Sequence, residues 1–183
     1  LHCSSAASDV YKRQIQGLTE FLPVSSSGHL EITRELLDTN QLPSDNLLMT
    51  SVLHFATALS TILVFRKDIY NLIIGFFDKE NKTSKSYVIK ILIAIVPAGL
   101  VGFLFSDEIE FLFSGNMTLV GIMLIITGTL LFLTKILKTK NFKISRFHAL
   151  IIGLSQAFAV IPGISRSGAT ICTSLFLGNN KSE

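Results

Sequence analysis

Two short stretches of the sequence bring serine, glycine and ionisable side chains together beside a proline. The first is FLPVSSSGHL at residues 21–30, directly after Glu20, and the second is PGISRSGAT at residues 162–170. Arginine carries a planar fork of donors that fits a phosphate or a carboxylate, and backbone N–H groups at helix starts also attract anions. We therefore expect an anion site, in which a divalent cation would offset the repulsion between Glu20 and a phosphate.

The elements that position these residues have the composition of membrane helices. Hydrophobic residues make up 49% of the 183-residue chain and charged residues only 16%, unlike an average soluble domain. Windows at about residues 47–65, 87–105 and 117–134 have the ~20 apolar residues that cross a bilayer. The sequence therefore predicts an all-α, polytopic membrane protein.

The connections between these windows alternate in charge. Residues 66–86 and 135–146 carry clusters of lysine and arginine, whereas the charges of residues 106–116 are all acidic. Since basic connections stay in the cytoplasm, the first polar stretch is expected to open to the outside. The excess of positive charge is thus explained by the membrane topology, and we do not expect a nucleic-acid partner.

The two polar stretches are copies of one pattern, GL[TS][EQ], then a proline, then SxSG. The pattern falls on residues 17–20, 23 and 25–28 in one copy and on residues 153–156, 162 and 165–168 in the other. Matching glycines lie 136 residues apart at the start of the pattern and 140 at its end. Because three spans separate the copies, they should enter the membrane in opposite senses, as inverted repeats do.

Each copy also has the pattern of a broken helix. Apolar residues with helical periodicity precede Pro23 and Pro162, which lack a backbone donor, and serines beyond them suit a helix N-cap. Irregular backbone at membrane depth persists only where it is buried in protein or lines a wet cavity. The sequence thus predicts broken or re-entrant helices at about residues 15–30 and 148–178, with one polar site between them.

Some of these residues have plainer interpretations. Glu20 and Arg166 could form a structural ion pair, and the serines could simply cap helices. His54, alone in an apolar window, is more typical of a packed residue bonded to a neighbour. Glu31 is expected to be a solvated loop charge.

The segments QGLTEFLPVSSSGH and PGISRSGAT resemble the two signatures of the undecaprenyl-diphosphate phosphatase family, the bacitracin-resistance membrane phosphatases of cell-wall lipid recycling. VLHFATALSTILVFRKDI, residues 52–69, resembles the span that follows the first signature. The resemblance covers about residues 15–178. It implies a multi-pass hydrolase of the bacterial plasma membrane, which removes the terminal phosphate of undecaprenyl diphosphate during peptidoglycan synthesis.

The resemblance also assigns residues. The acidic motif of the family, Glu or Gln followed four positions later by Glu, falls on Gln16 and Glu20, and we expect these two residues to hold Mg²⁺ or Ca²⁺. The first position is Gln16 rather than Glu, which removes a possible metal carboxylate. The predicted catalytic residues are Glu20, Ser26, His29 and Arg166. The predicted substrate-binding residues are Ser25, Ser27, Gly28, Gly163, Ser165, Ser167 and Thr170.

The nucleophile stays open at this stage. Ser26 needs an adjacent base, which Glu20 or His29 could provide, whereas His29 could itself attack and form a phosphohistidine. Arg166 is expected to stabilise the transferring phosphoryl group. The partners implied are the polyprenyl diphosphate lipid and the bilayer, and the sequence leaves a homo-oligomer open.

Two other functions compete with this reading. A secondary transporter or lipid-phosphate flippase would use the same inverted site without a nucleophile. An acid-phosphatase-like lipid phosphatase shares the triplet Ser27-Gly28-His29, but its other motifs are missing here.

The ends of the chain are expected to lie outside the complete domain. Residues 1–14 have no apolar signal region and are expected to be foreign to the fold or disordered. Residues 15–183 are expected to form a single transmembrane domain that is incomplete at its C-terminus, because members of the family continue through further spans.

Overall fold

The computed structural model describes residues 2–36, 43–78, 80–112, 116–136 and 142–180. The all-α class predicted from the sequence is confirmed for this part of the chain, which contains no strand beyond an isolated bridge between Phe142 and Asn179. The helices are α1 (His2–Thr19), α2 (Ser26–Leu36), α3 (Pro43–Val64), α4 (Arg66–Phe77), α5 (Lys82–Leu104), α6 (Ser106–Leu112), α7 (Met117–Thr134), α8 (Arg146–Phe158) and α9 (Arg166–Phe176).

Both predicted helix breaks are present, and each helix ends four residues before its proline, α1 at Thr19 and α8 at Phe158. Pro23 lies in the turn between α1 and α2, and Pro162 lies in the turn between α8 and α9. Proline cannot donate the backbone hydrogen bond that would continue a helix, and a serine at the start of the next helix accepts one of its free N–H groups. Each half of the pattern therefore forms a helical hairpin with a short irregular turn.

Within the described residues, two helices are long and apolar enough to cross a membrane, α5 and α7. No residue of α5 is buried, so its apolar side chains are available to lipid or to other apolar partners. The remaining predicted window, residues 47–65, coincides with α3, whose described apolar part, Ser51–Val64, is shorter than a membrane span. The sequence did not predict α4 and α6, which occupy stretches expected to be connections.

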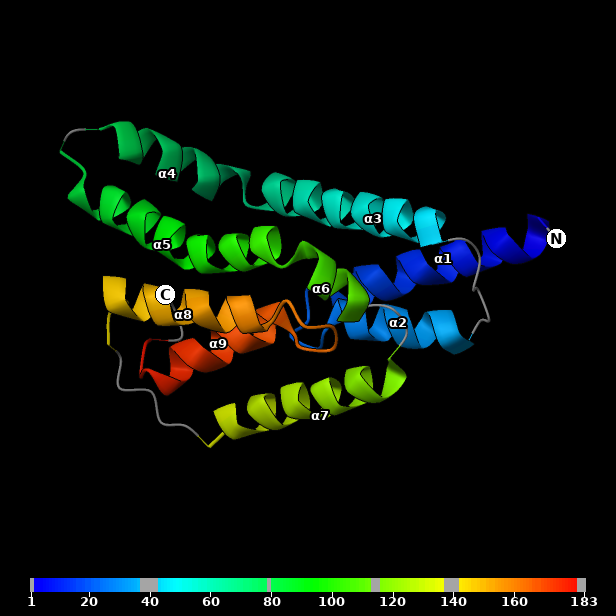
Figure 1. Ribbon diagram of the computed structural model, residues 1–183. Coiled ribbons are helices and arrows are strands. Elements are labelled where there is room, and N and C mark those ends of the chain that lie inside the picture. Colours follow the sequence, from blue (N-terminus) through cyan, green and yellow to red (C-terminus); the bar gives the residue numbers. More distant parts are fainter. Residues whose placement is uncertain (1, 37–42, 79, 113–115, 137–141, 181–183) are drawn as a thin grey trace.

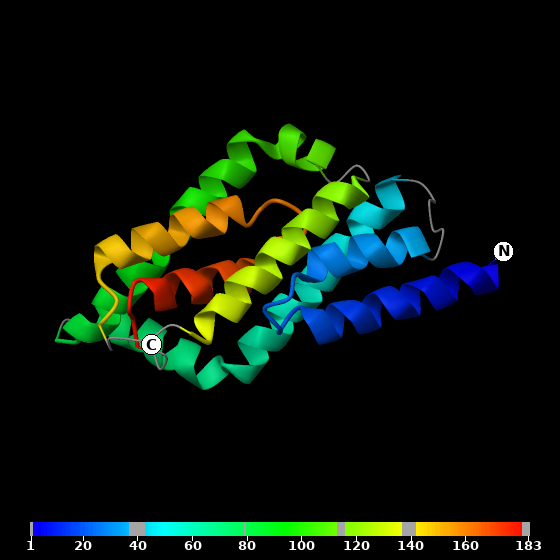
Figure 2. The same ribbon diagram turned by 90° about the horizontal axis from the view of Figure 1, so that it is seen from below.

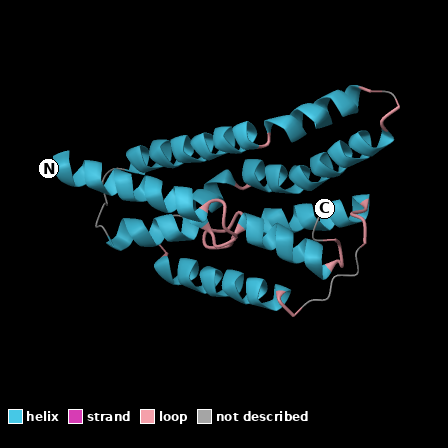
Figure 3. Ribbon diagram, turned by 180° about the vertical axis from the view of Figure 1, so that it is seen from behind, coloured by secondary structure: helices cyan, strands magenta, loops and turns pink. Residues whose placement is uncertain are grey.

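The two hairpins enter the molecule from opposite ends. In Figure 1, α1 and α2 extend from their turn towards one end, whereas α8 and α9 extend from theirs towards the other. The two turns lie next to each other at the centre, where Figure 3 shows them as loops between the helices. The proline-containing turns, 136 to 140 residues apart in the sequence, are thus brought together in space.

Other helices surround this centre. Helix α5 packs along α8, and α7 packs against both α9 and α2 (Figure 2). Helices α3 and α4 form an outer layer, in which α3 contacts α1 and α4 contacts α5. The turns therefore lie between α7 on one side and α3 on the other, away from the ends of the molecule.

Candidate active site

The two turns make reciprocal backbone contacts at glycines. A Cβ built on Gly28 would lie 3.1 Å from the Gly163 Cα atom, and one built on Gly168 would lie 3.0 Å from the Pro23 carbonyl oxygen. Gly163 also has a φ of 93°, which a residue with a side chain rarely adopts. Among the predicted substrate-binding residues, Gly28 and Gly163 therefore have a structural task, which is to let the two turns approach.

Equivalent serines cap the helices that leave the two turns. Ser25 Oγ accepts a hydrogen bond from the Gly28 N–H at 3.3 Å, and Ser165 Oγ accepts one from the Gly168 N–H at 3.0 Å. Each capping oxygen also lies close to the serine two residues on, at 3.3 Å from Ser27 Oγ in the first copy. The predicted N-caps are present, and the two copies have the same local hydrogen bonds.

Ser25 differs from its counterpart in its backbone. Its φ is 68°, in the left-handed region that is uncommon for residues other than glycine, whereas Ser165 has a φ of −75°. Strained backbone of this kind clusters at functional sites. The second turn is held in place by helix α7. Thr127 Oγ1 of this helix donates to the Gly163 carbonyl and accepts from the Ser165 N–H, both at 3.1 Å.

A cavity of about 810 Å³ opens beside the turns. This volume is in the range of small-molecule sites. Its walls come from both hairpins and from α3. The predicted site residues that line it are Glu20, Ser25, Ser26, Ser27, Ser165, Arg166, Ser167 and Thr170.

Glu20 is the centre of a hydrogen-bonded group in this cavity. Its Oε2 accepts from Ser26 Oγ at 2.6 Å and from Gln16 Nε2 at 2.8 Å, and its Oε1 lies 3.7 Å from His54 Nδ1. Ser26 and Gln16 both donate to the carboxylate, and donated hydrogen bonds favour its ionised form. An ionised carboxylate is thus positioned to take the Ser26 proton.

Arg166 is the first residue of α9, and its exposed side chain reaches the cavity wall. Across the ranges that the structure describes, no ion pair joins Arg166 to Glu20. The alternative in which these two residues form a structural ion pair is therefore not supported. A guanidinium at the wall of a cavity can bind phosphate oxygens through two parallel hydrogen bonds.

His29 lies one turn into α2 but is not among the residues that line the cavity. Its Nδ1 lies 2.8 Å from the Ser25 carbonyl oxygen. Because a carbonyl only accepts, Nδ1 carries the proton and Nε2 is left as an acceptor. The structure therefore brings Ser26 to Glu20 within hydrogen-bonding distance, whereas His29 makes its bond to the backbone of the turn.

A divalent cation fits the carboxylate side of the cavity. Mg²⁺ is usually bound by one or two carboxylates together with substrate phosphates and water. Glu20 Oε1 accepts no hydrogen bond from another described side chain, and no group of three His, Cys, Asp or Glu residues occurs in the described ranges. The second predicted ligand, Gln16, points its Nε2 towards Glu20, and its buried Oε1 has no partner. Glu20 would thus be the main protein ligand.

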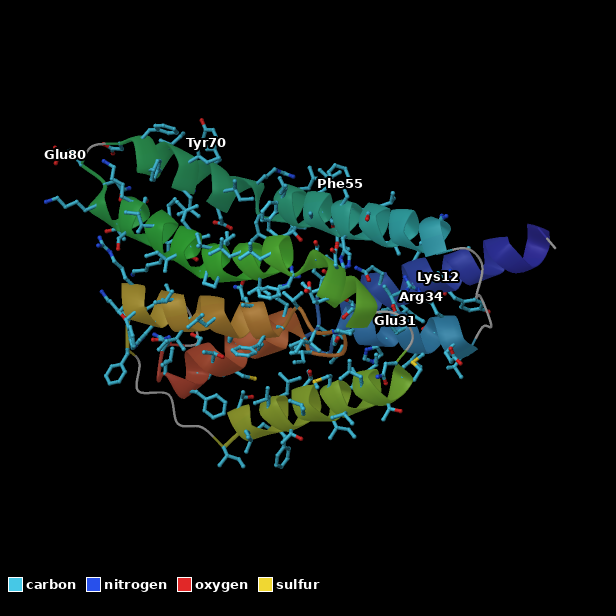
Figure 4. All side chains as sticks on the ribbon, viewed as in Figure 1. Lys12, Glu31, Arg34, Phe55, Tyr70 and Glu80 are labelled. Carbon is cyan, nitrogen blue, oxygen red and sulfur yellow. The ribbon has the colours of Figure 1, made fainter. Side chains whose placement is uncertain are left out.

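A second charged pair lies at the wall of the same cavity, and here the sequence-based prediction is wrong. Glu31 belongs to α2 and is only 8% exposed, whereas it was expected to be a solvated loop charge. Arg34, one turn further along α2, donates to Glu31 Oε1 at 2.5 Å. Lys12 of α1, also 8% exposed, belongs to the same charged region (Figure 4).

Comparison with known proteins identifies the chain. A family model described as Bacitracin resistance protein BacA matches residues 14–183. The chain belongs to the BacA family. Together with the apolar helices, this membership indicates a membrane protein.

Three relatives show how far the BacA similarity extends. The Undecaprenyl-diphosphatase of Christiangramia forsetii is 53% identical over 169 residues, which is 92% of this chain and 64% of the relative. Proteins of the same name from Bacteroides fragilis and Methanococcus vannielii are 46% and 42% identical, over 63% and 67% of their lengths. The chain thus spans a little under two thirds of the first two relatives.

Sequence reasoning missed two parts of this BacA-family site. His54, Thr57, Ala58 and Thr61 of α3 line the cavity, at the i, i+3, i+4, i+7 spacing of one helix face. That spacing was visible in the sequence as a polar stripe in an apolar window. Thr127 gave no comparable signal, because the hydroxyl of a single threonine in a span usually bonds to its own helix.

Proposed function

We propose that the complete BacA-family protein containing this chain hydrolyses undecaprenyl diphosphate to undecaprenyl phosphate and inorganic phosphate. The relatives are named for this activity. The observation that carries the proposal is the 2.6 Å hydrogen bond from Ser26 to Glu20, in a cavity that Arg166 also lines. These residues supply the nucleophile, the base and the fixed cation that phosphoryl transfer requires.

Ser26 is the nucleophile of the proposed reaction. Glu20 Oε2 takes the Ser26 hydroxyl proton while Ser26 Oγ bonds to the terminal phosphorus. The bond from that phosphorus to the bridging oxygen breaks, and undecaprenyl phosphate leaves with the electron pair. Water then attacks the phosphoserine, the proton on Glu20 returns to Ser26 Oγ, and inorganic phosphate leaves with the oxygen and both hydrogens of the water.

The competing nucleophile, His29, has less support. Ser26 lines the cavity and has a base 2.6 Å away, whereas His29 lies outside the lining residues. We assign His29 to the support of the turn, since its Nδ1 holds the Ser25 carbonyl next to the catalytic serine. The N–H groups of the first turns of α2 and α9, together with Ser27, Ser167 and Thr170, are proposed to contact the diphosphate.

The proposal includes Mg²⁺ or Ca²⁺, which would be bound by Glu20 while Gln16 donates a hydrogen bond to the other carboxylate oxygen. Such an ion neutralises charge on the diphosphate and polarises the phosphorus–oxygen bond. Arg166 would hold the equatorial oxygens of the transferring group from the opposite hairpin.

We further propose that the two hairpins are inverted repeats of re-entrant helices in a multi-pass protein of the plasma membrane. The matched N-caps and the reciprocal glycine contacts support this arrangement. In Figure 1 the start of α5, which carries Lys82 and Lys85, and the start of α8 lie at one end, and the acidic α6 lies towards the other. The positive-inside rule then places α6 outside, which is the side proposed for entry of the lipid head group. The names of the relatives do not favour the transporter alternative.

The test is phosphate release by the full-length protein in detergent, followed by trapping of the covalent intermediate from radiolabelled lipid. We expect an acid-stable label that is lost in Ser26→Ala and retained in Ser155→Ala. Ser155 is the matched control, because its hydroxyl bonds to the carbonyl of Ile152 in its own helix and does not line the cavity. An acid-labile label lost in His29→Ala, or no release from the unsubstituted protein, would contradict the proposal.

A further inference from the structure

His54 reaches the acid side of the cavity from a different helix, α3. Its Nδ1 lies 3.3 Å from Gln16 Nε2 and 3.7 Å from Glu20 Oε1. Its side chain is 46% exposed and lines the cavity, unlike a histidine packed in a core. Neither signature of the sequence contains it, and the proposed reaction does not use it.

The hydrogen bonds of Gln16 determine what His54 can do. The Gln16 amide nitrogen carries two hydrogens, and one of them is donated to Glu20 Oε2 at 2.8 Å. The other is directed at His54 Nδ1, so Nδ1 accepts and the ring proton is on Nε2. Gln16 therefore bridges His54 and Glu20 by donating to both.

The reverse orientation of the amide is excluded by the same contacts. A flipped Gln16 would place its oxygen 2.8 Å from Glu20 Oε2, and two acceptors would then face each other. Gln16 is only 1% exposed, and its Oε1 has no partner among the described residues. The two donated bonds are thus what holds the amide in place.

We propose that His54 is a positioning residue, which acts through Gln16 on Glu20. By accepting from Gln16, His54 keeps the amide in the orientation that holds Glu20 Oε2 against the Ser26 hydroxyl. The inference rests on the proposed function, because it assigns His54 to the base of that reaction. A base must lie within about 2.6–3.2 Å of the group that it deprotonates. A displacement of ~1 Å can cost roughly 100-fold in rate.

The test compares variants of the full-length protein in a steady-state assay of phosphate release. We expect His54→Ala to lower kcat by about tenfold or more, with KM within about twofold, because in this proposal His54 acts on the base of the reaction and not on binding of the lipid. Asparagine places an amide oxygen where Nδ1 lies, so His54→Asn should recover most of kcat. Ser60→Ala is the control, because Ser60 is exposed on α3 and does not line the cavity.

A double-mutant cycle shows whether His54 acts through Gln16. In a Gln16→Ala background we expect His54→Ala to have little further effect on kcat, because the amide that it orients is already absent. Independent effects of the two substitutions, equal losses in His54→Asn and His54→Ala, or an unchanged kcat in His54→Ala would each overturn the inference.

Failure of the proposed function gives a different result. If the unsubstituted protein releases no phosphate, the function itself is wrong. Thermal unfolding of the four proteins of the cycle, which are the unsubstituted protein, His54→Ala, Gln16→Ala and the double variant, still tests the contact between His54 and Gln16. Two residues that are hydrogen-bonded should give non-additive changes in melting temperature. Additive changes in melting temperature would show that His54 does not hold Gln16.

Discussion

The same glycine of the repeated pattern should tolerate a methyl group in one copy and not in the other. An alanine at Gly153 would place its Cβ 2.6 Å from the carbonyl oxygen of Ala94 and 2.9 Å from its Cα atom. These are backbone atoms of α5 and cannot rotate away. At Gly17, the equivalent position of the first copy, no atom lies within 4 Å of the added Cβ.

The expected difference follows from these contacts. Overpacking of a closely packed contact costs about 1–3 kcal/mol, so Gly153→Ala should destabilise the protein by roughly that amount. Gly17→Ala should stabilise it by about 0.5–1 kcal/mol, because glycine inside a helix is unfavourable relative to alanine. The two variants should therefore differ by about 1.5–4 kcal/mol, or roughly 3–16 °C in melting temperature.

The assay is thermal unfolding of the full-length protein, followed with a thiol-reactive dye. Cys172 is 2% exposed, so its reaction with the dye reports unfolding, and Cys3→Ser serves as the background for all variants. Gly17→Ala is the matched control, because it makes the same chemical change at the same position of the pattern. Equal melting temperatures for the two variants would refute the close packing of α8 on α5.

Two further predictions concern the reaction, and a third concerns the stability of the second turn. Arg166→Lys should lower kcat by about 10²–10³, because an ammonium cannot replace the planar fork, and recovery of activity in this variant would contradict the role of Arg166. A chelator should abolish phosphate release, and full activity in chelator would exclude a role for the ion. Gln16→Glu should lower the Mg²⁺ concentration for half-maximal activity, because a second carboxylate then lies beside Glu20. Thr127→Val should leave a carbonyl and an N–H of the second turn unpaired and lower the free energy of unfolding by about 1–3 kcal/mol, as measured by thermal unfolding.

Local chemistry was the part of the fold that the sequence predicted well. Pro23 and Pro162 break their helices wherever the rest of the chain lies, and the following serines cap the next helix. The placement of site residues on two facing turns followed from the repeat. Contacts between distant helices were not predictable in this way, because they depend on how the helices pack.

Glu31, His54 and Gly153 illustrate that limit. Glu31 is buried because α2 continues past the first signature and packs against α1 and α7. His54 reaches Glu20 only because α3 lies against α1. The tight contact of Gly153 depends on α5, which has no counterpart beside Gly17 in the described structure.

Ser26 and Arg166 occupy the same position of the pattern, and each is the first residue of its helix. Equivalent positions of the two copies therefore both line the cavity, and one carries a hydroxyl whereas the other carries a guanidinium. The two phosphorus atoms of a prenyl diphosphate differ in that only one carries the prenyl ester, but both present anionic oxygens that the same donors can bind. The unlike pair gives the head group a single productive orientation, in which only one of its two phosphorus atoms faces the nucleophile. In the proposed reaction, this asymmetry is what selects the terminal phosphate and leaves the lipid-linked one in place.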